Sequence, residues 1–295
     1  MTSSPIHIVA TGLPHPEGVA FDGAGQLFTG TAVPDHVGRG PIHRVGPQGA
    51  VEYFADTGGR ALGLAFGPDE WLYVCDAGLS AIIRVSPTGE LEDFARRADG
   101  RALQLPNFAV FDRQGQLYVS DSGTATAGER TAAVYRYDAE GRGELVADGL
   151  VFANGLALDR GEGALYVAET RDDRILRIPL RGSDAGDPQV FADRLTSGPD
   201  GLAFDAAGNL LVTLTGTDSI VSVSPEGQPS LVAKSTDGRL RAPSNIAFSA
   251  TGEPVIYVAN VLGDHISRLS VEFPGAPLAF PARRDNPGRG GARHG

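Results

Sequence analysis

The chain is poor in several residue types, and each shortage excludes a class of structure or partner. A single cysteine, Cys75, rules out a disulfide framework or a cysteine-based zinc site. Lysine occurs once, at Lys234, and the formal net charge is −11. Nucleic acids and anionic membranes are bound through clustered Lys and Arg, so we expect neither as a partner. No apolar run approaches the roughly 20 residues that a membrane-spanning helix needs.

The two ends of the chain differ from the rest. Residues 1–11 contain neither a basic stretch nor a long apolar run, so we expect no signal peptide and a cytoplasmic location. No Pro/Ser-rich linker or charge run divides the middle, which favours one domain. The last residues are rich in Arg, Gly and Pro without periodicity. We therefore expect one domain over residues 1–273 and a disordered tail over residues 274–295.

An internal repeat organises the sequence. Each unit begins with an apolar strand ending in Phe or Leu, continues through a polar turn into a second apolar strand such as Leu72–Val74, and adds further short strands. The period is 44 to 47 residues, and the six units begin at Glu17, Leu62, Asn107, Asn154, Asp200 and Ser244. Four short strands in a unit of this length are typical of a β-propeller blade. The pattern predicts an all-β, six-bladed propeller of four-stranded blades.

The termini complete the last blade. The sixth repeat supplies three strands and stops near Ser270. At the other terminus, Ile6–Ala10 resembles Gln189–Ala192, the fourth strand of an earlier repeat. We therefore expect the N-terminal strand to close the ring and to leave no open sheet edge.

Polar residues at two other repeated positions have structural explanations. Asp and Gly between the first and second strands suit tight hairpin turns, and the aspartates are Asp22, Asp112, Asp159 and Asp205. A second set ends the second strands, where we expect it to organise loops above the channel; it consists of Asp76, Asp121, Glu169 and Asn260.

The repeat also brings polar residues together on the axis. The first strand of each blade is innermost, so the six residues that begin the repeats converge at one level. Two are carboxylates and two are amides, and none is Lys, Arg or His. Burying two carboxylates costs several kcal/mol per charge, so the countercharge is expected from outside the chain. A hard divalent cation suits this donor set, with Ca²⁺ first and Zn²⁺, Mn²⁺ or Fe²⁺ as alternatives. A hydrated polar channel is the structural alternative.

Three short motifs carry a family resemblance. They are His15–Gly18, Phe152–Asp159 and Gly198–Asp205, and together they resemble the SMP-30/gluconolactonase/LRE family over roughly residues 12–270. The resemblance implies a six-bladed propeller with a divalent ion in its channel, in a family that includes sugar lactonases and a calcium phosphotriesterase. It implies metal ligands at Glu17, Asn154 and Asp200. It makes Asn107 a fourth ligand or a contact to water and substrate at the metal.

The sequence departs from the family pattern at the channel mouth. Sugar lactonases of this family commonly have Arg two residues before the Asn of blade three and Asp directly after it, where this chain has Leu105 and Phe108. With Leu62 and Phe152 near the mouth, these apolar side chains do not favour a polyhydroxylated sugar acid such as gluconolactone. His15 lies two residues before Glu17 and is a further candidate for substrate contact, with a loop histidine as the structural alternative.

These residues lead to one functional hypothesis and two rivals. A metal-dependent hydrolase opening a small lactone would use Asp200 as general base or nucleophile. The first rival is phosphotriester hydrolysis at the same site. The second is a non-catalytic binding platform with a structural ion. The sequence predicts a small-molecule substrate and leaves the oligomeric state open.

Overall fold

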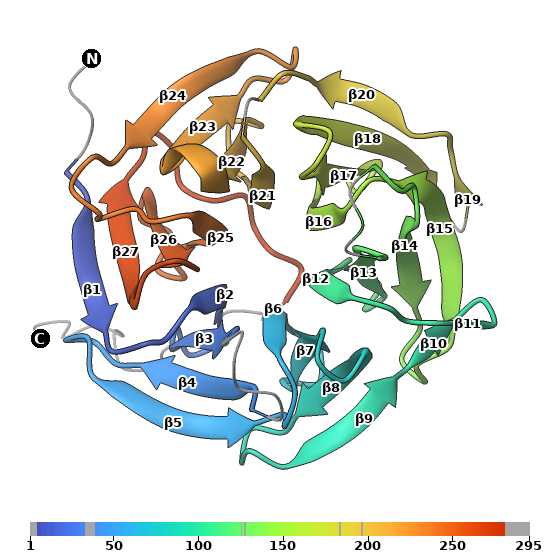
Figure 1. The fold of residues 1–295 in the computed structure, drawn as a ribbon, viewed down its shortest axis with the longest axis horizontal. Helices are drawn as coiled ribbons and strands as arrows, with labels where there is room; N and C mark the ends of the chain where they lie inside the picture. The colour runs from blue at the N-terminus through green and yellow to red at the C-terminus, as the bar shows by residue number, and fades with distance from the viewer. Residues whose placement is uncertain are drawn as a thin grey trace, which may run out of the picture.

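The computed structural model describes residues 5–32, 39–124, 126, 128–182, 184–195 and 197–280. These residues form six antiparallel sheets arranged as blades around one axis (Figure 1). Helix is confined, within these residues, to the 3-10 turn Thr215–Thr217, and no described helix is long and apolar enough to cross a membrane. The prediction of an all-β, six-bladed propeller is confirmed.

Each blade contains four strands. Blade one has β2 (Pro16–Phe21), β3 (Leu27–Thr31), β4 (Pro41–Val45) and β5 (Val51–Asp56). Blade two has β6 (Ala61–Phe66), β7 (Leu72–Asp76), β8 (Ala81–Val85) and β9 (Leu91–Ala95). Blade three has β12 (Pro106–Phe111), β13 (Leu117–Asp121), β14 (Ala132–Tyr137) and β15 (Gly143–Leu150). The short strands β10 (Arg97–Ala98) and β11 (Arg101–Ala102) form a separate hairpin.

The second half of the ring repeats this order. Blade four has β16 (Ala153–Leu158), β17 (Ala164–Glu169), β18 (Arg174–Arg181) and β20 (Gln189–Ala192), and β19 (Asp184–Ala185) pairs with the end of β18. Blade five has β21 (Pro199–Phe204), β22 (Leu210–Leu214), β23 (Ser219–Val223) and β24 (Pro229–Lys234). Blade six has β25 (Pro243–Phe248), β26 (Val255–Asn260) and β27 (His265–Ser270) from the C-terminal part of the chain.

The N-terminal strand completes blade six. Strand β1 (His7–Thr11) pairs antiparallel with β27, with His7 opposite Arg268 and Thr11 opposite His265. Figure 1 shows this blue strand beside the red C-terminal ones. The predicted closure is confirmed. It ties the two ends of the chain together by backbone hydrogen bonds and leaves no blade with three strands.

Aromatic and aliphatic side chains join neighbouring blades. Edge-to-face ring pairs cross the blade boundaries, with centroid separations of 4.9 to 5.2 Å. These pairs are Phe28–Phe66, Tyr73–Phe111, Tyr166–Phe204 and Phe21–Tyr257. Each such pair adds about 0.5–1.5 kcal/mol beyond the area that it buries. The core of the molecule is therefore a ring of interfaces between blades, and the axis is left to other side chains.

The hairpin aspartates act as turn residues. Oδ1 of Asp112 accepts hydrogen bonds from the backbone N–H groups of Gln114 and Gln116, at 3.0 and 2.8 Å. Asp22 and Asp205 make the same pair of bonds in their own turns. The structural interpretation of these residues is confirmed.

Residues 274–280 cross the axis at the end of the inner strands. Ala206 N–H donates to the carbonyl of Pro274 at 2.8 Å, and Ala276 N–H donates to Phe204 in blade five at 2.9 Å. Phe280 then packs edge-to-face on Phe111 of blade three, at 6.4 Å between centroids. The sequence assigned these residues to the tail, but they lie on the propeller; the remainder of that predicted tail is outside the described residues.

Candidate metal centre

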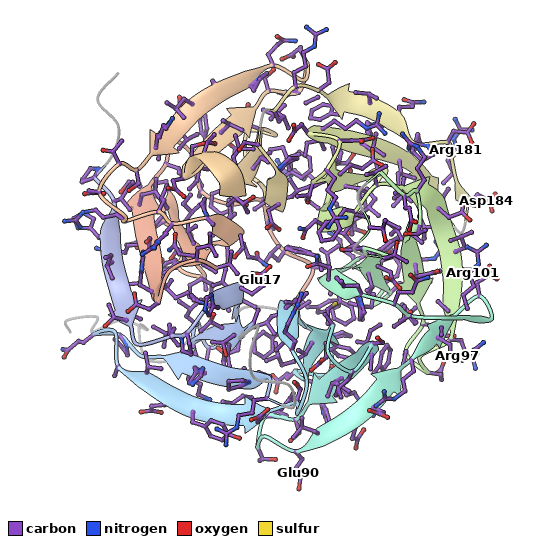
Figure 2. All side chains as sticks on the ribbon, viewed as in Figure 1. Glu17, Glu90, Arg97, Arg101, Arg181 and Asp184 are labelled. Atoms are coloured by element: carbon purple, nitrogen blue, oxygen red, sulfur yellow. The ribbon has the colours of Figure 1, made fainter. Side chains whose placement is uncertain are left out.

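One residue of every inner strand lies at the same level of the axis. The second residues of the six inner strands are Glu17, Leu62, Asn107, Asn154, Asp200 and Ser244. Figure 2 places Glu17 on β2 near the centre of the ring. The strand register shifts at this level in all six blades, as between Pro199, opposite Leu214, and Leu202, opposite Val212. Bulges of this kind re-aim side chains, here at the start of each inner strand.

Glycines let neighbouring inner strands approach closely at this ring. A Cβ on Gly155 would lie 2.0 Å from the carbonyl oxygen of Asp200, and one on Gly18 would lie 2.2 Å from that of Leu62. Gly63 and Gly201 are equally confined by the backbone of the next blade. The ring therefore has its small diameter because four blades lack a side chain directly after the ring residue.

Buried hydroxyl groups on the second strands tie the ring residues of adjacent blades together. Ser120 Oγ donates to the carbonyl of Asn154 at 2.6 Å, and Thr213 Oγ1 donates to that of Ser244 at 2.9 Å. Ser244 Oγ in turn donates to the carbonyl of Glu17 at 3.1 Å, which links the last blade to the first. These groups fix the backbone from which the ring side chains project.

The two carboxylates interact across the ring. Asp200 is only 7% exposed, and burial followed by the charge of Glu17 raises its pKa well above the ordinary value. Burial raises the pKa of Glu17 to about 7, while the positive charge of Arg60 and a hydrogen bond from Ser244 act in the opposite direction. Two buried like charges that act on each other favour either a shared proton or a bound cation.

The amides supply neutral oxygens beside these carboxylates. Oδ1 of Asn154 is buried and has no hydrogen-bond partner among the described residues, although the side chain is 4% exposed. The Nδ2 group of Asn107 donates to Ser122 Oγ at 2.9 Å, and Ser122 donates to the carbonyl of Ala153 at 2.7 Å. This anchors the nitrogen end of the Asn107 amide. An orphaned buried oxygen costs about 1–3 kcal/mol unless a ligand satisfies it.

The donor set fits a hard divalent ion. No group of three or more His, Cys, Asp or Glu side chains able to hold a metal occurs in the described part of the chain. The ring instead offers two carboxylates and amide oxygens, the ligands that Ca²⁺ takes in proteins. The residues present therefore match the group that the resemblance implies.

Each blade contributes one further residue two positions before the ring residue, directly ahead of its inner strand, and we call these six residues the mouth. They are His15, Arg60, Leu105, Phe152, Gly198 and Ala242. The backbone φ is positive at four of them, with values of 51° at His15, 53° at Phe152, 69° at Gly198 and 47° at Ala242. Such left-handed backbone is unfavourable for residues with a Cβ and clusters at functional sites.

Three predicted substrate residues lie at this mouth. His15 Nδ1 lies 2.7 Å from the carbonyl oxygen of Val261, so Nδ1 carries the proton and Nε2 is the other, proton-accepting nitrogen. The guanidinium of Arg171 stacks on the ring of Phe152, 4.3 Å from its centroid. Leu105 is half-buried. The other three predicted residues lie lower: Leu62 and Asn107 are buried in the ring itself, and Phe108 lines the cavity below it.

The sequence did not predict the contribution of Arg60. The six ring positions contain no Lys, Arg or His. Arg60, two residues before Leu62, nevertheless brings a positive charge of the chain itself to act on Glu17. Its backbone N–H donates to Oδ1 of Asp76 at 2.7 Å. The repeat register was the available signal, because Arg60 occupies the position that His15 occupies in blade one.

The polar residues at the ends of the second strands hold the mouth loops. Asp121 accepts from the backbone N–H groups of Gln104 and Leu105, at 2.7 and 2.8 Å. Glu169 accepts from Val151 at 2.7 Å. Asn260 does the same for Arg241 in blade six, at 2.8 Å. The expectation that these residues organise loops is confirmed.

The other end of the axis is apolar. A cavity of about 160 Å³ lies among the later residues of the inner strands, lined by side chains such as Phe108, Leu156 and Leu202. Residues 276–280 also line it, from the segment that crosses the axis. The polar ring thus separates a mouth with charged and aromatic groups from an apolar interior.

Solved structures resemble the whole propeller, among them the two that follow. A gluconolactonase from Xanthomonas campestris superposes with a TM-score of 0.78 at 23% identity, over 91% of this chain and 90% of that one. Regucalcin from Agrobacterium tumefaciens, described as a calcium-binding protein, gives a TM-score of 0.76 at 17% identity, over 95% and 100%. At these identities the likeness supports the fold alone.

Sequence relatives extend the comparison. The Drosophila melanogaster adipocyte plasma membrane-associated protein Hemomucin is 32% identical over 55% of this chain and 31% of its own length. The Zymomonas mobilis gluconolactonase is 26% identical over 88% of this chain and 80% of its own length. The chain spans between about a third and two thirds of the length of the plant and fly relatives it matches. The SMP-30/gluconolactonase/LRE-like model matches residues 14–261, so the chain belongs to that family.

Proposed function

We propose that the protein is a metal-dependent hydrolase that opens a small lactone. The observation that carries the proposal is the buried pair Glu17 and Asp200, with an Asn154 oxygen in the same ring that has no hydrogen-bond partner among the described residues. Membership of the family and the similarity to gluconolactonases support the choice of reaction.

Glu17, Asn154 and Asp200 would hold the ion, with Asn107 as a fourth ligand or a contact to substrate. All four offer oxygen, which favours Ca²⁺, and the similarity to a protein described as calcium-binding supports that choice. A divalent ion held there supplies Lewis acidity, which polarises the lactone carbonyl and stabilises the developing oxyanion.

The chain itself supplies the proton transfer. Asp200 either accepts a proton from the attacking water or attacks the carbonyl carbon with its own oxygen. In the first case the water oxygen bonds to the carbonyl carbon, the bond to the ring oxygen breaks, and the proton passes from Asp200 to that oxygen. In the second case the ring oxygen leaves with a proton from solvent, and a water then hydrolyses the anhydride formed with Asp200. Both routes consume one water and give a hydroxy acid. The ring holds Asp200 in place through the confined backbone at Gly155 and Gly201.

The mouth indicates which lactones fit. Leu105 and Phe152 present apolar surface on the side of blades three and four. Polyhydroxylated sugar lactones would leave hydroxyl groups unpaired there, which is costly. We therefore propose a lactone with few hydroxyl groups, with His15 Nε2 as an acceptor for the substrate at the rim.

A panel of substrates tests the proposal. The calcium-loaded protein is assayed by pH-stat against γ- and δ-lactones of increasing chain length, gluconolactone and a phosphotriester, with chelated protein in parallel. Lactone hydrolysis that disappears on chelation is the expected result. Hydrolysis of the phosphotriester and of no lactone would show that the site catalyses phosphotriester hydrolysis instead. Failure to hydrolyse any of them would favour a binding platform.

A further inference from the structure

Arg60 contrasts with two other buried or half-buried arginines among the described residues. Arg136 pairs with Glu144, and Arg174 pairs with Glu169 and Asp172. Arg60 belongs to none of the ion pairs formed among the described residues. Its Nε is buried and, within the same residues, has no hydrogen-bond partner. A charged donor left in this state calls for an acceptor.

The backbone holds Arg60 firmly at the mouth. Its N–H donates to Asp76 at 2.7 Å, and its carbonyl accepts from the N–H of Ala77 at 3.0 Å. Asp76, the nearest acid of this loop, already accepts from the N–H of Leu79 and from the hydroxyl of Thr57 as well. The guanidinium therefore starts from a fixed point, and Asp76 is occupied by other donors.

Charge bookkeeping at the site favours an anion. The positive charge of Arg60 acts on the carboxylate of Glu17 and lowers its pKa, although burial raises that pKa by more. Once a divalent ion is bound, it balances the charges of Glu17 and Asp200, and the guanidinium of Arg60 forms no ion pair with any carboxylate among the described residues. The Arg60 residue is partly exposed, as are Leu105 and Phe152 at the same repeat position. Guanidinium groups recognise carboxylates through two parallel hydrogen bonds.

We propose that Arg60 makes the blade-two side of the mouth a carboxylate-binding subsite. It takes the carboxylate of the hydroxy acid that lactone opening produces, or a carboxylate substituent of the substrate. This inference rests on the proposed function, because a loaded metal ring is what releases Arg60 from Glu17. The subsite makes the protein prone to inhibition by its own product.

Calorimetric titration of the calcium-loaded protein tests the subsite directly. Butyrate is the probe, and butyramide is its uncharged counterpart of the same shape. Wild-type protein is expected to bind butyrate more tightly than butyramide. Arg60→Gln should weaken butyrate binding about 10-fold or more, the effect of losing one charge-assisted contact. Arg60→Lys should retain part of the affinity, because it keeps the charge without the planar fork.

Arg181→Gln is the matched control. Arg181 is exposed at the outer edge of blade four, where Figure 2 labels it, so its loss changes the net charge equally without touching the mouth. Its butyrate affinity should equal that of wild type. Melting temperatures of all variants establish that they are folded. Equal butyrate affinity in wild type and Arg60→Gln, or equal affinity of wild type for butyrate and butyramide, would overturn the proposal.

The two proposals fail separately. Arg60-dependent binding of butyrate by a protein that hydrolyses no lactone would uphold the subsite and reject the reaction. Lactone hydrolysis by a protein whose affinity for butyrate does not depend on Arg60 would uphold the reaction and reject the subsite.

Discussion

At the scale of single residues, the carboxylates of Glu17 and Asp200 are buried together although their charges repel each other. The orphaned oxygen of Asn154 lies beside them and also lacks a partner among the described residues. A fold optimised only for stability would replace such a group with apolar side chains, because an unsatisfied polar cluster costs several kcal/mol. A bound cation removes all three costs at once.

Asp200→Asn keeps an oxygen and nearly the same volume but removes the charge and the proposed base or nucleophile. We expect kcat for lactone hydrolysis to fall by at least about 10²-fold, with a smaller loss of calcium occupancy when calcium is in excess. Asp187→Asn, at an exposed loop position, should leave kcat unchanged. Near wild-type kcat in metal-loaded Asp200→Asn would show that Asp200 does no chemistry.

Glu17 predicts a pH dependence of stability in the metal-free protein. Its pKa is raised from 4.5 to about 7 by burial, so folding favours the protonated form. The associated stability is present below pH 4.5 and is lost as the pH rises through 7. The free energy of unfolding of Glu17→Gln should therefore exceed that of wild type by a margin that grows from pH 5 to pH 8.

Chemical denaturation in the presence of a chelator measures this margin. Glu52→Gln, at an exposed position, should show no such trend. A margin for Glu17→Gln that stays constant from pH 5 to pH 8 would contradict the raised pKa.

The ring residues could be found from the sequence because the repeat fixes their register. Arg60 and the hydroxyl groups of Ser120 and Thr213 could not. Their roles depend on how far a side chain reaches and on bulges that shift the strand register by one residue. The repeat gives the positions of these residues, but the residue types alone do not give the contacts that their side chains make.

At the scale of elements, the inner strands are spaced by their glycines. Gly155→Ala would place a Cβ 2.0 Å from the carbonyl oxygen of Asp200, so β16 or β21 must shift. We expect a loss of about 1–3 kcal/mol in the free energy of unfolding and a weaker affinity for calcium. Gly161→Ala is the control, because the nearest atom to its Cβ lies at 3.7 Å. Urea denaturation of both variants measures the difference, and equal stabilities would refute the spacing argument.

The segment of residues 274–280 that crosses the axis is expected to be held in part by the ring contact between Phe280 and Phe111. Phe280→Ala removes the edge-to-face contact with Phe111 and should lower the free energy of unfolding by about 0.5–1.5 kcal/mol. Leu278→Ala, two residues earlier, should have no effect because Leu278 is 69% exposed. Thermal or urea unfolding separates the two outcomes. If Phe280→Ala also had no effect, the segment would not be held by this contact.

At the scale of the whole molecule, the sequence predicted the blades and their closure by β1 because both follow from one repeated pattern. It did not predict that residues 274–280 cross the axis. This segment belongs to no repeat, and its position depends on two backbone hydrogen bonds to blade five and on the packing of Phe280 in blade three.

Whether the ring binds a metal ion can be measured by calorimetric titration of Ca²⁺ into chelator-stripped protein. We expect one saturable site per chain and a melting temperature that rises with calcium, because an ion bound only by the folded state stabilises it by mass action. The heat of binding should vanish in the double variant Glu17→Gln, Asp200→Asn. If wild type showed no saturable binding, or if the double variant bound Ca²⁺ as wild type does, the ring would not be the metal site.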